Sequence, residues 1–129
     1  RLTDVAGSSR YFLFSGVTYA NEAKVSVLGV LPETLESCGA VHEQTAKEMA
    51  EGARRVAGAD YGLSVTGIAG PDGGTDDKPV GTVWFAWAVR DGSAALTDTS
   101  CELFSGDREL VRELTVAHAL QGVLERIES

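Results

Sequence analysis

The sequence predicts an α/β domain of three layers, α/β/α, built on a mixed, mostly parallel sheet with one antiparallel hairpin. Three observations lead to this prediction. Segments of helical periodicity at 43–58 and 107–127 are interleaved with continuous apolar runs at 61–69 and 81–90. Apolar runs without alternation are typical of strands covered on both faces. Residues 91–93 (DGS) have hairpin composition and are followed by a further strand pattern at 94–104.

The first third of the chain predicts one strand and two short helices. Residues 11–20 are rich in aromatic and β-branched side chains and predict a strand, with Gly16 at a bulge. Asn21 is a favourable cap for a helix over 21–29 that ends at Gly29. Pro32 lies in the first turn of a second short helix over 31–39.

Two longer helices follow, each with an apolar face. Residues 43–58 carry Ala46, Met49, Ala50, Ala53, Val56 and Ala57 on one face. Asp107 is a suitable cap for the last helix, which runs through residue 127. Its predicted buried stripe is Leu110, Leu114, Ala117, Leu120, Leu124 and Ile127.

Composition limits the classes of function. A chain of 129 residues with 43% hydrophobic and 23% charged residues is the size and composition of one soluble domain. Its net charge of −8 disfavours nucleic acid and anionic membranes as partners. Cys38 and Cys101 fit no metal or redox spacing, so we expect reduced thiols and a cytoplasmic location. His42 and His118 are too separated in sequence to predict a metal site.

Residues 66–82 (TGIAGPDGGTDDKPVGT), the glycine loop, are richer in glycine than a simple turn requires. The loop matches neither the P-loop nor the dinucleotide fingerprint. Its candidate ligand-binding residues are Gly67, Gly70, Gly73 and Gly74, whose amides can approach an anion closely, together with the hydroxyl of Thr66. The alternative is a mobile surface connection. The aspartates at 72, 76 and 77 lack the spacing of a calcium loop and are expected in solvent.

Lys24 is the candidate general base. It falls in the first turn of the helix predicted after Asn21, where the peptide dipoles disfavour an ammonium group. A partly desolvated lysine there has a lowered pKa, as a base acting near neutral pH requires. Tyr19, at the end of the preceding strand, would present its phenol to the same crevice. The alternative places Lys24 in solvent and packs Tyr19 on a helix.

Arg108 is the candidate anion clamp. It lies in FSGDRE, in the first turn of the last helix, where its side chain and nearby amides suit a phosphate. An ordinary surface arginine is the alternative interpretation.

Taken together, YANEAK (19–24), the continuous TGIAGPDGGTDDKPVGTVWFA (66–86) and FSGDRE (104–109) resemble one family over essentially the whole chain. That family is the carboxy-terminal domain of the competence/damage-inducible protein CinA, which also occurs alone as nicotinamide-nucleotide amidase. The segments GVTYANEAK (16–24) and GAV (39–41) strengthen the resemblance.

The resemblance implies hydrolysis of the carboxamide of nicotinamide mononucleotide to nicotinate mononucleotide and ammonia, with no metal or other cofactor. It implies a serine nucleophile with Lys24 as its base and Tyr19 assisting, while Thr66 and Arg108 hold the substrate. A homo-oligomer is expected, because small sheets of this kind leave apolar ends exposed.

The family's Ala-Glu-Ser-Cys-Thr-Gly-Gly motif, which carries the nucleophile, does not occur in these 129 residues. Ser8 and Ser9 belong to a turn after that motif and do not replace it. The opening residues RLTDVAGSS resemble the end of a helix, so we expect a domain over 1–129 that lacks its amino-terminal strand and serine segment; a catalytically inactive nucleotide-binding or regulatory module is the alternative. A third interpretation makes the acidic surface a docking face for a DNA-uptake or recombination partner.

Overall fold

The structure is a computed structural model that describes residues 2, 4, 6–92 and 94–128. A single 3-10 turn, Ser8–Arg10, precedes the helices α1 (Asn21–Leu28), α2 (Pro32–Cys38) and α3 (Glu43–Ala57). The strands β1 (Tyr61–Gly67), β2 (Thr82–Asp91) and β3 (Ala94–Leu103) follow, and α4 (Arg108–Glu128) ends the fold. The predicted turn at 91–93 and the predicted helix end at 1–9 include residues 93, 1, 3 and 5, which lie outside the described residues.

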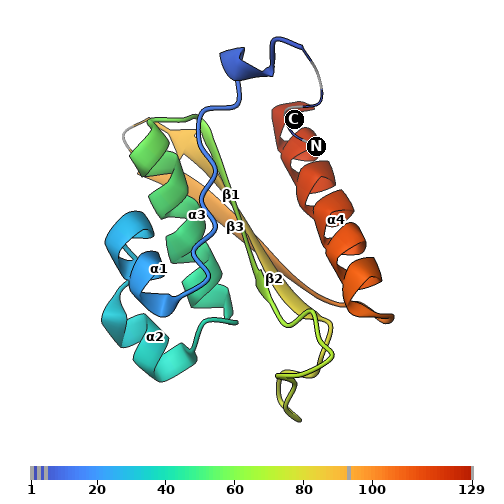
Figure 1. Cartoon of the computed structure of the whole chain (residues 1–129). Helices are drawn as coiled ribbons and strands as arrows, with labels where there is room; N and C mark the ends of the chain where they lie inside the picture. Colours follow the sequence, from blue (N-terminus) through green and yellow to red (C-terminus); the bar gives the residue numbers. More distant parts are fainter. Residues whose placement is uncertain (1, 3, 5, 93, 129) are drawn as a thin grey trace.

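The three strands form one antiparallel sheet in the order β1-β2-β3. Helix α3 packs on one face of this sheet with α1 and α2 beside it, and α4 covers the other face, so the α/β class and its layers are confirmed (Figure 1). The predicted mixed, mostly parallel sheet is not confirmed, since both pairings among the described strands are antiparallel. The physical reason is that no helix links consecutive strands, whereas a parallel pair requires such a crossover.

The predicted strand at 11–20 is wrong for the chain as described. Residues 12–19 form neither helix nor strand, although they run alongside β1 and in the same direction (Figure 1). The side chains of Tyr11 and Val17 are 67% and 90% exposed. Strand propensity is realised only when a neighbouring strand supplies hydrogen bonds, and a cavity separates this segment from β1.

Helix α3 carries the predicted apolar face over most of its length. Ala46 and Ala50 are fully buried against Ala86 and Ala88 of β2. A Cβ at Gly52 would lie 1.8 Å from the Leu28 carbonyl oxygen, so only glycine permits the contact between α3 and the end of α1. Val56 departs from the prediction and is 51% exposed, whereas Ala53 and Ala57 are half-buried.

The predicted buried stripe of α4 is wrong in its orientation. Five of its six members are exposed and Leu120 is half-buried, while Val111, Ala119 and Gly122 are buried instead. The cause is Trp87 of β2, whose indole lies so close to Gly122 that an added Cβ would come within 2.3 Å of the ring. Small residues on α4 therefore face the sheet, a choice that apolar periodicity does not reveal.

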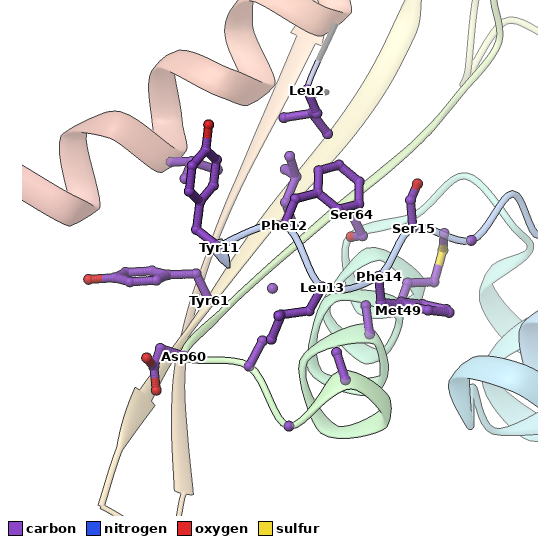
Figure 2. Close-up of a pocket in the computed structure, with 18 of the residues that line it drawn as sticks. Leu2, Tyr11, Phe12, Leu13, Phe14, Ser15, Met49, Asp60, Tyr61 and Ser64 are labelled. Carbon is purple, nitrogen blue, oxygen red and sulfur yellow. The ribbon is translucent and has the colours of Figure 1, made fainter. Parts of the chain in front are cut away.

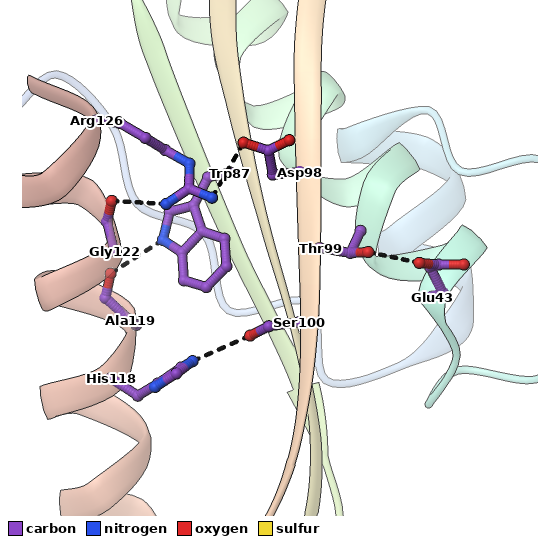
Figure 3. A network of polar contacts seen from close by, with 9 residues as sticks. All are labelled: Glu43, Trp87, Asp98, Thr99, Ser100, His118, Ala119, Gly122 and Arg126. Atoms are coloured by element: carbon purple, nitrogen blue, oxygen red, sulfur yellow. Dashed lines mark hydrogen bonds and ion pairs between the residues drawn. The ribbon is translucent and has the colours of Figure 1, made fainter. Parts of the chain in front are cut away.

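Polar contacts fix this orientation of α4 (Figure 3). The Trp87 Nε1–H donates to the Ala119 carbonyl at 3.1 Å. The Arg126 guanidinium lies 4.3 Å from the centre of a Trp87 ring and pairs with Asp98 of β3 at 3.1 Å. These contacts hold the second half of α4 on the sheet, and the buried side chain of Val111 anchors its first half.

Candidate functional site

Lys24 is buried near the start of α1. Ala20, in extended conformation, occupies the cap position without a side-chain bond, so the prediction that Asn21 caps this helix is wrong by one residue. The Lys24 side chain is 6% exposed, and its Nζ donates to the carbonyl oxygen of Thr18. Burial lowers the pKa of the Lys24 amine below its usual value of 10.5. The alternative of a solvated lysine is contradicted.

Tyr19 immediately precedes the same helix and lies in a different environment. Its side chain is 89% exposed, so it does not pack on a helix as the alternative interpretation required. The phenol is free to meet a ligand from the solvent side, whereas Lys24 lies beneath the surface. Tyr19 therefore supplies an accessible hydroxyl, and Lys24, a few residues further along the chain, supplies a desolvated amine.

The glycine loop leaves β1 at Gly67 and returns to the sheet at Thr82. Gly70 and Gly73 have positive φ angles of 83° and 97°, and a Cβ at Gly70 would lie 2.4 Å from a Val80 methyl carbon. A Cβ at Gly74 would lie 2.7 Å from the Val80 amide nitrogen. At Gly70 and Gly74 the backbone passes too close to Val80 for a side chain, and at Gly73 the positive φ favours glycine, which is the physical reason for the glycine content.

Arg108 contacts this loop directly. Its Nη1 donates to the Gly70 carbonyl oxygen at 3.0 Å. Asp107 caps α4 as predicted, by accepting from the Leu110 amide at 2.9 Å, and so fixes the turn that carries Arg108. Because a guanidinium has five N–H donors, the remaining ones can bind an anion beside the loop.

Thr66 is buried at the end of β1, and its hydroxyl donates to the Ala40 carbonyl at 2.7 Å. The hydroxyl hydrogen is therefore in use, and a ligand would meet Thr66 as an acceptor. Gly67 lies at the last position of β1, where a Cβ would come within 2.8 Å of the Thr82 carbonyl oxygen. Both residues sit at the point where the glycine loop begins.

The candidate residues gather at one end of the molecule. Figure 1 shows that β1 and the segment before α1 lead to the same end, where the glycine loop and the start of α1 lie. Arg108 and Gly70 are in contact there. No direct contact joins Lys24 or Tyr19 to the glycine loop among the described residues, so the structure brings them to the same end without closing the site.

Sequence reasoning missed Lys78. Its Nζ donates to the Cys38 carbonyl oxygen at 2.9 Å and so ties the glycine loop to the end of α2. Between residues 71 and 79 it is the one residue that is not exposed. A basic residue after two aspartates resembles ordinary surface composition, and the long-range partner leaves no mark in the sequence.

The two histidines make packing and hydrogen-bond contacts, and the two cysteines form no disulfide. His118 packs 4.4 Å from the Phe85 ring centre, and its Nε2 lies 3.0 Å from the Ser100 hydroxyl (Figure 3). His42 caps α3 by accepting from the Gln44 amide. Cys38 and Cys101 are free thiols.

Within the described ranges, no three His, Cys, Asp or Glu side chains are grouped as metal ligands would be. No helix in those ranges is long and apolar enough to span a bilayer.

Two hollows flank the outer edge of β1. The edge cavity, of about 720 Å³, lies between residues 10–16, the end of α3 and β1. Figure 2 shows residues 11–15 along one side of it, with Tyr61 and Ser64 of β1 and Met49 of α3 on the others. A groove of about 560 Å³ lies between β1 and α4 and is lined mainly by apolar side chains. Leu63 and Val65 of β1 border both hollows and are half-buried, so this strand is fully covered on the face towards α3 and only partly covered on the face towards α4.

The fold and site define an α/β domain in which a desolvated lysine and a glycine-rich, arginine-clamped loop lie at one end. Residues 1–127 match the family described as the CinA C-terminal domain. The chain belongs to this family, as its motifs predicted.

The named relatives differ in the share of their own length that this chain covers. The chain is 54% identical over 120 residues to the nicotinamide-nucleotide amidohydrolase PncC of Escherichia coli strain K12. The aligned region makes up 93% of this chain and 71% of that protein. The chain is 68% identical over 91 residues to a CinA-like protein of Desulfosudis oleivorans. That aligned region makes up 70% of this chain but only 22% of that protein. The crystal structure of a competence/damage inducible protein from Agrobacterium tumefaciens superposes with a TM-score of 0.88 at 43% identity, covering 96% of this chain and 74% of that one.

Proposed function

We propose that this domain hydrolyses the carboxamide of nicotinamide mononucleotide to nicotinate mononucleotide and ammonia, a step of pyridine nucleotide salvage. Two findings support the proposal: the similarity to PncC over 93% of the chain, and the burial of Lys24 with its lowered pKa. The second finding supports the proposed mechanism, because a lysine acts as a base only when a useful fraction of its amine is uncharged.

Lys24 is assigned the role of general base toward a serine nucleophile. The serine oxygen attacks the carboxamide carbon while its proton moves to the Lys24 amine. Backbone amides stabilise the tetrahedral oxyanion, each donor contributing about 3 kcal/mol. The protonated amine, or the phenol of Tyr19, then gives a proton to the nitrogen as the C–N bond breaks and ammonia leaves. Water resolves the acyl-enzyme by the same steps with the proton transfers reversed.

The nucleotide phosphate is assigned to the glycine loop and Arg108. The protein carries a net charge of −8, so an anionic substrate needs local positive potential. Arg108 supplies it beside Gly70, and the amides of Gly67, Gly73 and Gly74 lie on backbone free of side chains. Thr66, whose hydroxyl proton is already donated to Ala40, accepts from a substrate N–H or O–H group.

The nucleophile is assigned to chain outside these 129 residues, on a segment that enters the edge cavity as a strand. The cavity lies between two stretches of parallel direction, residues 11–16 and β1, and β1 pairs only with β2 among the described strands. A strand there would hydrogen-bond both neighbours and cover Leu63 and Val65. It would also produce the mixed sheet that the sequence predicts, with residues 11–16 as a strand.

We assign the protein to the cytoplasm and expect a homo-oligomer. The side chains of Leu96 and Leu103 on β3 are each 64% exposed, and the far edge of β3 has no partner among the described strands. An exposed apolar strand edge is a surface that proteins commonly cover.

The test is ammonia release from nicotinamide mononucleotide by the protein with its serine segment, comparing wild type with Lys24→Met. We expect the variant to lose 10²-fold or more of kcat, the usual contribution of general base catalysis, while nucleotide affinity is retained. Lys47→Met, on α3, is the matched control. Turnover within a few-fold of wild type would exclude Lys24 as the base. A wild-type protein that binds the nucleotide without releasing ammonia would favour the binding-module alternative.

A further inference from the structure

Three consecutive carbonyl oxygens, beginning at the last residue of α2, accept hydrogen bonds from three different elements. The Cys38 carbonyl accepts from Lys78 Nζ of the glycine loop at 2.9 Å. The Gly39 carbonyl accepts from Thr45 Oγ1 of α3 at 2.6 Å, and the Ala40 carbonyl accepts from Thr66 Oγ1 of β1 at 2.7 Å. Residues 38–40, the junction, thus connect the loop, a helix and a strand at one place.

The junction is built for these bonds. Thr45 is fully buried and Thr66 nearly so. Gly39 has a φ of 80°, which favours glycine, and a Cβ there would lie 3.5 Å from Lys78 Nζ. Because the backbone turns at Gly39, neighbouring carbonyls point to different elements. Two of the three donors, Thr45 and Thr66, belong to regular elements of the core, so the junction is a fixed support for the third.

Lys78 is the donor that belongs to an otherwise exposed segment. The residues on either side of it, from 71 to 79, are exposed. The Thr75 amide donates to the Lys78 carbonyl at 2.9 Å, and the Lys78 amide donates to Thr75 Oγ1 at 3.0 Å, so a tight turn fixes the base of the lysine side chain. The bond from a charged donor to a partly buried carbonyl is stronger than a neutral one.

We infer that Lys78 is a positioning residue that sets the place of residues 70–78 of the glycine loop relative to Thr66 at the end of β1. Arg108 holds the loop near its start, at Gly70, and Lys78 holds it near its end. Between these two points lie Gly73 and Gly74. Lys78 and Thr66 bond to carbonyls only two residues apart, so the amides and the Thr66 hydroxyl share one support. This inference rests on the proposed function where it concerns the nucleotide, and on geometry alone where it concerns the loop.

The test combines amide hydrogen exchange with nucleotide binding for Lys78→Met, Lys78→Arg and the control Lys47→Met. For Lys78→Met we expect exchange of the Thr75 amide, which donates to the Lys78 carbonyl, to accelerate about tenfold or more, the effect of losing one charged hydrogen bond. We also expect the Kd for nicotinamide mononucleotide to rise by a similar factor. Lys78→Arg should restore part of both losses, and Lys47→Met should match wild type. Thermal unfolding confirms that each variant is folded.

Two results would overturn the inference. Unchanged exchange of the Thr75 amide in Lys78→Met would show that the bond to Cys38 does not position the loop. Faster exchange with unchanged nucleotide affinity would show that loop position does not matter for binding. If the wild-type protein fails to bind the nucleotide at all, the proposed function fails, while the exchange data still decide whether Lys78 holds the loop.

Discussion

Replacing Arg108 with alanine separates substrate binding from chemistry. The change removes the bond from Nη1 to the Gly70 carbonyl, whose donor and acceptor lie 3.0 Å apart. A partly exposed hydrogen bond of this kind contributes about 1 kcal/mol. A direct contact between the guanidinium and the substrate phosphate would add about 1 to 2 kcal/mol. The total of about 2 to 3 kcal/mol corresponds to a rise in KM of roughly 30- to 150-fold.

The assay is steady-state ammonia release from nicotinamide mononucleotide with the protein that carries the proposed serine segment. We expect kcat to change less than threefold, because Arg108 bonds to the loop and is proposed to bind the phosphate rather than the reacting carboxamide, so its loss removes binding shared by ground and transition states. Arg112→Ala, one turn further along α4 and exposed, is the matched control. An unchanged KM would remove Arg108 from the phosphate site, and a large fall in kcat with constant KM would assign it to the chemistry instead.

Three further predictions concern the loop, the α4 interface and the pH dependence. Gly70→Ala places a Cβ 2.4 Å from a Val80 methyl carbon at a φ of 83°. Binding of nicotinamide mononucleotide, measured by calorimetry, should therefore weaken tenfold or more. An affinity equal to that of wild type would contradict the assignment of the phosphate to this loop. Gly122→Ala places a Cβ 2.3 Å from the Trp87 ring and should lower the free energy of unfolding in urea by about 1 to 3 kcal/mol; no loss would refute the observed orientation of α4. Burial lowers the Lys24 pKa in the folded chain, so the unfolded chain binds more protons between that pKa and 10.5. Stability should therefore rise with pH across this window in wild type relative to Lys24→Met, and parallel pH profiles of the two proteins would contradict it.

The sequence was sufficient where local chemistry decides the structure. The caps at Gly29 and Asp107, the proline in the first turn of α2 and the apolar face of α3 were all predicted correctly, because each depends on residues close in sequence. Its conflict with the helix dipole singled out Lys24 as a candidate base, but the sequence left open whether the side chain is buried, which the structure shows.

Predictions failed where contacts between residues far apart in sequence decide the structure. The side of α4 that faces the sheet is set by Trp87 fitting beside Gly122, which no periodicity in α4 records. Residues 11–20 have strand composition but no strand at hydrogen-bonding distance, so their propensity is not realised. Lys78 was missed because its partner, Cys38, lies forty residues away. In each case the missing information is a tertiary contact rather than a local preference.

The ionisation of Lys24 tests the central claim most directly. An NMR titration that follows the ε-methylene of Lys24, assigned by its loss in Lys24→Met, measures the pKa of that amine in the folded protein. The structure predicts a value below 10.5, because the amine is buried and its recorded partner is the neutral Thr18 carbonyl. A pKa at or above 10.5 would mean that the amine stays charged at neutral pH, and Lys24 could then not serve as the base.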